Sequence, residues 1–135
     1  MGVRPKQEHA GMMSGKVIVT NVGVLRAKYG AAGLAKLKAA LAALIAADKQ
    51  RGIATILIAI DSVAAMAKVG APAVTQPGDR RTVKRAVDAI CGKLSPDYLL
   101  ILGAPDVVPH QELANPVFSP GDDDDRVVPT DLPYA

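Results

Sequence analysis

The chain has 135 residues and a net charge of +3, and half of its residues are hydrophobic. This length is enough for one domain with a buried core and leaves no room for two. Its single cysteine, Cys91, excludes an internal disulfide and a cysteine-based metal cluster. Aromatic residues are scarce, so we expect an aliphatic core in which Ala- and Leu-rich helices cover a sheet.

Charge is distributed unevenly along the chain. Residues 1–104 carry fifteen Lys and Arg against six Asp and Glu, whereas residues 105–135 carry one against seven. An acidic tail can neutralise basic helices of the same chain, which argues against nucleic acid as a partner. The apolar runs are shorter than the roughly 20 residues of a membrane span, and the charged Lys16 opens the first of them. We therefore predict a cytoplasmic protein without a membrane partner.

The first half of the chain predicts a leader, a strand, a long helix and a second strand. Residues 1–14 are polar and without periodicity, which is typical of a flexible leader. Residues 16–20 form a short β-branched run that predicts a strand. Leucines recur along one stripe of residues 33–50, which predicts a helix. Residues 53–60 are apolar except for Thr55, which predicts a second buried strand.

The second half predicts two further helices and a third strand. Asp61 and Ser62 fit the cap of a short helix over residues 63–68, and Asp79 fits the cap of a helix that runs to Lys93. Residues 98–102 form a third apolar run without polar alternation. This alternation predicts an α/β fold: a three-layer sandwich with a mostly parallel, flavodoxin-like sheet in the strand order 2-1-3.

Residues 105–135 differ in character from the α/β domain predicted over residues 15–104. Six prolines fall within these 31 residues, with four aspartates between them. Such a composition predicts an irregular segment, which a compact domain rarely keeps unless the segment is functional or is completed by something else. We expect it to lead into a carboxyl-terminal portion beyond this sequence.

Two motifs near the end of the chain carry a family resemblance. They are DYLLILG at residues 97–103 and, after a proline loop and an acidic stretch, TDLPYA at residues 130–135. Together they resemble the amino-terminal subdomain of gingipain-type cysteine peptidases, where a strand ending in Val-Gly-Asp leads through a Pro loop to Ser-Asp followed by Tyr-Ala. Gly103 matches that pattern, whereas Ala104 stands for the usual Asp and Thr130 for Ser. Residues 16–95 share only the order of elements.

The resemblance implies a caspase-like fold and a parent hydrolase whose catalytic His and Cys lie later in the chain. His110 is followed by Gln111 rather than Gly, and Cys91 precedes the third strand, so neither is carried over as catalytic. We expect a non-catalytic portion that packs against a carboxyl-terminal catalytic portion or a second copy. The alternative is a stand-alone flavodoxin-like module that binds a small anionic ligand through Asn21, Ser62 and backbone amides at the strand ends.

Polar residues follow the predicted strands at the edge where ligands bind in parallel sheets. The candidates for a ligand site are Asn21, Asp61, Ser62, Asp106 and His110. Capping of helices and turns also explains Asp61, Ser62 and Asp106. A triad of Ser62, His110 and Asp106 is formally available, but no Gly-x-Ser-x-Gly elbow supports it.

Two charged clusters suggest binding sites. Asp122, Asp123, Asp124 and Asp125 could chelate calcium, since hard cations prefer carboxylate oxygens, but the spacing of an EF-hand is absent. A solvated acidic loop is the competing interpretation, and no other cofactor is predicted. Residues 80–85 carry four positive charges without interleaved aromatics, which favours a solvated helix face over nucleic-acid binding.

Overall fold

The computed structural model describes residues 14–135 and is built on a three-stranded parallel sheet. Strands β1 (Ser14–Thr20), β2 (Ile53–Ala59) and β3 (Tyr98–Ile101) lie in the order β2-β1-β3. Both neighbours of β1 run parallel to it. The α/β class, the parallel sheet and the strand order 2-1-3 are therefore confirmed. Apart from Ser14, the predicted leader over residues 1–14 lies outside the described residues.

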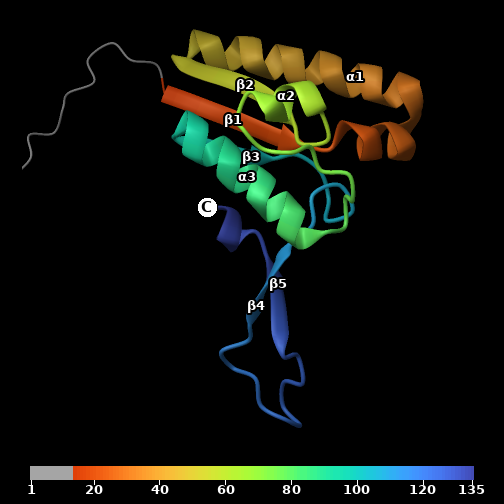
Figure 1. The fold of residues 1–135 in the computed structure, drawn as a ribbon, viewed down its shortest axis with the longest axis vertical. Helices are drawn as coiled ribbons and strands as arrows, with labels where there is room; N and C mark the ends of the chain where they lie inside the picture. Colours follow the sequence, from red (N-terminus) through yellow and green to blue (C-terminus); the bar gives the residue numbers. More distant parts are fainter. Residues whose placement is uncertain (1–13) are drawn as a thin grey trace, which may run out of the picture.

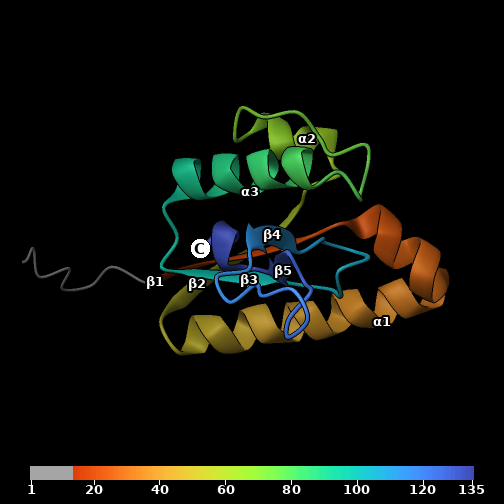
Figure 2. The ribbon, with the colours of Figure 1, turned by 90° about the horizontal axis from the view of Figure 1, so that it is seen from below.

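Helices cover both faces of the sheet (Figures 1 and 2). Helix α1 (Val22–Gln50) lies along one face, and α2 (Val63–Ala67) and α3 (Arg80–Leu94) lie on the other. This arrangement follows from chain connectivity, because a right-handed crossover from β1 to β2 and another from β2 back to β3 place their helices on opposite faces. The three layers are those of the predicted sandwich.

The central strand and α3 supply much of the core. Val17, Ile18 and Val19 of β1 are all buried, as expected for the middle strand of a sheet that is covered on both faces. Val83, Val87 and other apolar residues recur at helical spacing on the buried face of α3. Among the buried hydrophobic residues in the described part of the chain, Tyr134 is the one aromatic, so the core is mainly aliphatic.

Helix α1 is longer than the helix predicted over residues 33–50. It begins at Val22 and is kinked at Gly30, whose φ of +71° is not helical. By length and composition it is the one helix of residues 14–135 that could span a membrane, which the short apolar runs of the sequence did not indicate. In the structure, Leu25 and Leu34 of α1 are buried in the hydrophobic core.

Within residues 105–135, where the sequence predicts an irregular segment, the structure contains a short hairpin. Strands β4 (Gln111–Ala114) and β5 (Val127–Thr130) pair antiparallel and project away from the sheet (Figure 1). The chain then returns as a 3-10 helix, η1 (Leu132–Tyr134), beside α3. Tyr134 anchors this return, because its side chain is buried and its hydroxyl donates to the carbonyl of Pro109.

Candidate functional site

The carboxyl ends of β1 and β2 bring Asn21 and Asp61 together at the start of α1. The Asp61 carboxylate accepts hydrogen bonds from the N–H groups of Val22, at 2.9 Å, and Gly23, at 2.8 Å. The Asn21 side chain accepts from the N–H of Val24 at 3.1 Å. A Cβ at Gly23 would lie 3.1 Å from an Asp61 oxygen, so glycine permits this close approach.

The amides at the start of α1 are therefore already satisfied by the protein's own groups. A helix N-terminus binds anions through free N–H groups and its dipole, but here a carboxylate of the same chain fills that position. Ser62 is engaged as well, because its hydroxyl accepts from the N–H of Ala65 at 3.2 Å and caps α2. The cap predicted for Ser62 is confirmed, whereas Asp61 caps α1 and not the short helix that follows it.

Asn21 retains one unused hydrogen-bonding group. Its side chain is only 2% exposed, and its Nδ2 has no hydrogen-bond partner among the described residues. A hollow of about 320 Å³ lies beside it, lined also by Asp61, Val74 and Thr75. A hydrogen-bond acceptor that entered this hollow would satisfy the Asn21 amide.

Removal of the Asp61 carboxylate should weaken the first turn of α1. We expect Asp61→Ala to lower the free energy of unfolding by about 1–2 kcal/mol, because two N–H groups lose their acceptor. Urea denaturation measures the loss. Ser62→Ala removes one hydrogen-bond acceptor from α2 and should lower the free energy of unfolding by a smaller amount. An Asp61→Ala protein as stable as the parent would contradict this role.

Asp106 and His110 lie on the loop after β3 and have partners of their own. Asp106 forms an exposed ion pair with Lys28 of α1 at 2.9 Å, and the hydrogen bond from Lys28 lowers the pKa of that carboxyl. The His110 Nε2 lies 3.7 Å from a carboxylate oxygen of Asp131. Since Ser62 caps α2, the three members of the formal triad each have a different partner, and these contacts do not form a nucleophile–base–acid chain.

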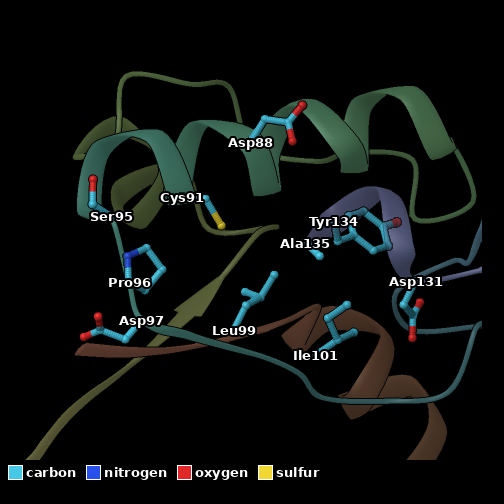
Figure 3. Close-up of a pocket in the computed structure, with 10 residues that line it drawn as sticks. All are labelled: Asp88, Cys91, Ser95, Pro96, Asp97, Leu99, Ile101, Asp131, Tyr134 and Ala135. Carbon is cyan, nitrogen blue, oxygen red and sulfur yellow. The ribbon is translucent and has the colours of Figure 1, made fainter. Parts of the chain in front are cut away.

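Cys91 projects from α3 toward β3 (Figure 3). Its side chain is half-buried, and that burial raises the pKa of its thiol. A nucleophilic cysteine requires the opposite shift, because the thiolate is the reactive form. The structure thus agrees with the interpretation of Cys91 as a small packed side chain.

The four aspartates of residues 122–125 lie in the turn that connects β4 to β5. Asp123 accepts from the side chain of Asn115 at 3.0 Å and from the N–H of Asp125. Asp124 accepts from the N–H of Gly121 at 2.9 Å. Within residues 14–135, no three His, Cys, Asp or Glu side chains are grouped so that they could hold a metal ion. The observed contacts of this cluster are those of a turn.

The acidic end of the chain contacts basic helices, as its composition suggests. Arg80 of α3 pairs with Glu112 of β4 at 3.0 Å, and its Nε donates to the carbonyl of His110. Gln111 adds a hydrogen bond to the carbonyl of Arg80. Together with the Lys28–Asp106 pair, these contacts connect residues 105–135 to the sandwich.

A groove of about 720 Å³ lies between α3 and β3 (Figure 3). Leu99 and Ile101 of β3 form its apolar floor, and Cys91 reaches down from α3. Tyr134 and Ala135 line it from η1 and the end of the chain. The sequence marked residues 98–102 as apolar but gave no sign of this groove, because the groove exists only when η1 has returned to α3.

The comparisons with known proteins add no identification. No family model, no curated protein and no solved structure matches the chain.

Proposed function

We propose that the chain is the non-catalytic amino-terminal part of a caspase-like, gingipain-like cysteine peptidase and supports a catalytic portion supplied by further residues of the parent protein. One observation carries the proposal. The two motifs of the family resemblance lie about thirty positions apart in the sequence, yet both line the groove beside β3. Leu99 and Ile101 come from the first motif, and Asp131, Tyr134 and Ala135 come from the second.

The incomplete burial of β3 also favours the proposal that this chain packs against a further part of the protein. Uninterrupted apolar strands of parallel sheets are normally covered on both faces. Leu99, Leu100 and Ile101 are only half-buried, and Tyr98 is 54% exposed. A further layer or strand packed against β3 would remove this apolar surface from water, which is favourable by about 25 cal/mol per Å².

The proposal assigns no catalytic residue within this chain. The raised pKa of Cys91 is unsuited to a nucleophile, and the catalytic His and Cys belong to the further portion. A cytoplasmic location is part of the proposal. It rests on the charged Lys16 at the start of the first apolar run and on the packing of Leu25 and Leu34 of α1 in the core.

The test is a peptidase assay on the protein encoded by the natural reading frame beyond Ala135. We expect the longer protein to cleave peptides and to lose activity when a downstream cysteine is replaced by alanine. Cys91→Ala in the same protein should leave kcat unchanged. A reading frame that stops at Ala135, a longer protein without peptidase activity, or activity that depends on Cys91 would each contradict the proposal.

A further inference from the structure

β3 is a short edge strand that carries no charged residue, proline or bulge to block pairing. In the order β2-β1-β3 it pairs with β1 alone, so one row of its N–H and C=O groups has no partner strand among residues 14–135. Natural proteins protect such edges with charges, prolines or bulges. The four residues of β3, Tyr-Leu-Leu-Ile, include no charge and no proline. This edge is open to pairing with another extended segment.

The groove distinguishes β3 from β2, which is the other edge strand and is equally uncharged. Side chains of a strand alternate between the two faces of the sheet. A strand added beside β3 would therefore direct every second side chain toward α3, next to Leu99 and Ile101. These two side chains already form an apolar floor on that face.

Acidic side chains surround the apolar floor. Asp88, Asp97 and Asp131 line the groove, and no Lys or Arg does. Each has one partner in the structure: Lys84 for Asp88, the N–H of Gly15 for Asp97, and His110 for Asp131. The side chains of Asp88 and Asp131 remain 54% and 49% exposed, so both carboxylates can accept a further donor. The rim thus favours a basic occupant.

We propose that the open edge of β3 binds an extended segment with alternating apolar side chains and basic ends, by β-strand addition. Main-chain hydrogen bonds to the free edge would supply affinity, and the apolar floor and acidic rim would supply selectivity. The inference rests on the proposed function in one respect, since the segment would belong to the catalytic portion. A second copy of the chain fits less well, because pairing two β3 edges would bring two acidic rims together.

A synthetic peptide tests the site on the present chain. The probe is fluorescein-labelled Lys-Val-Thr-Val-Thr-Val-Lys, and its anisotropy is measured as the protein is added. We expect saturable binding, and binding about tenfold weaker or less for the same peptide with Glu at both ends. The bound peptide should also slow the reaction of Cys91 with N-ethylmaleimide, because Cys91 lines the groove. Equal affinity for the two peptides, or no protection of Cys91, would overturn the proposal.

Two variants separate the groove from the rest of the sheet. Ile101→Glu places a carboxylate on the groove floor and should abolish binding of the Lys-ended peptide. Ile56→Glu is the matched control, because Ile56 is 45% exposed on β2 at the other edge, and this variant should bind as the parent does. Binding that survives Ile101→Glu or is lost in Ile56→Glu would place the site elsewhere.

A charge-reversal variant covers the case in which Ile101→Glu does not fold. Asp88→Lys combined with Asp131→Lys changes two exposed rim residues and should reverse the preference toward the Glu-ended peptide. An unchanged preference would contradict strand addition at this rim. These outcomes are distinct from failure of the proposed function, which depends on peptidase activity of the longer protein and not on peptide binding by this chain.

Discussion

Gly103→Ala is expected to lower the free energy of unfolding by about 3 kcal/mol or more. Gly103 is in the turn that leaves β3, with a φ of +125° that side chains of L-residues rarely adopt. A Cβ there would lie 2.5 Å from the Cβ of Val107, which is itself fully buried. Backbone strain and steric overlap therefore add together, and urea denaturation measures their sum.

Gly121→Ala provides the matched control. Gly121 also has a positive φ, of +93°, but no atom lies within 4 Å of the position that its Cβ would occupy. This variant should lower the free energy of unfolding by about 1 kcal/mol, because it introduces backbone strain without steric overlap. Equal losses in the two variants would show that the contact with Val107 is not the source of the larger effect.

Asp48→Asn should produce the second large effect, a melting temperature lower by roughly 10 °C. The Asp48 side chain is fully buried near the end of α1, where it pairs with Lys16 at 2.7 Å and with Arg51. It also accepts from the hydroxyl of Thr55 at 2.7 Å. An asparagine would leave the partly buried Lys16 without its counter-charge, which is costly in a site of low polarity. Differential scanning calorimetry at pH 7 measures the change.

The same residue should control acid stability. The hydrogen bonds from Lys16 and then Thr55 lower the pKa of Asp48 from 3.8 to about 2. Since the folded pKa lies below the unfolded one, the stabilisation is complete above pH 4 and is lost as the pH falls toward 2. Asp48→Asn should therefore reduce the fall in stability between pH 4 and pH 2.

Asp106→Asn controls for ordinary surface ion pairs. Asp106 pairs with Lys28 in an exposed position, where such pairs contribute little. This variant should melt within a few degrees of the parent at pH 7. If the melting temperature of Asp106→Asn fell as far as that of Asp48→Asn, the effect could not be assigned to burial of the Asp48 carboxylate.

The sheet was predictable because its signal is local. The residues of each strand are mostly apolar and contiguous, so the runs at residues 16–20, 53–60 and 98–102 predict the three strands without knowledge of the fold. The helical segments between them then limit the topology to parallel crossovers. The cap at Asp79 was predictable for the same reason, since its carboxylate accepts from the N–H groups of residues two and three positions later.

The β4–β5 hairpin and the kink in α1 were not predicted from the sequence. β5 contains Pro129, and a proline within a run argues against a strand unless the strand lies at an edge. The edge position of β5 in a two-stranded sheet is known only from the structure. Gly30 interrupts the helical backbone inside α1, and only the part of this helix that follows the kink was predicted from the sequence.

The polar residues at the strand ends were named from the sequence, but their hydrogen-bond partners were not predicted. Asp61 was predicted to cap the helix over residues 63–68, but it caps α1 instead. Its partners lie 38 and 39 positions away, and such a separation leaves no local signature. The groove beside β3 likewise depends on the packing of η1 against α3. This packing places Tyr134 at the same groove as Ile101, which lies more than thirty positions earlier in the sequence. Long-range pairings of this kind are set by tertiary packing.

Hydrogen exchange at β3 tests the central claim, that this chain is a platform whose third strand receives another part of the parent protein. The measurement compares the amides of Tyr98–Ile101 in the present chain with those in the longer protein that the proposed function requires. The account predicts that amides on the open edge exchange at least about tenfold more slowly in the longer protein. Equal exchange of every β3 amide in the two proteins would contradict it.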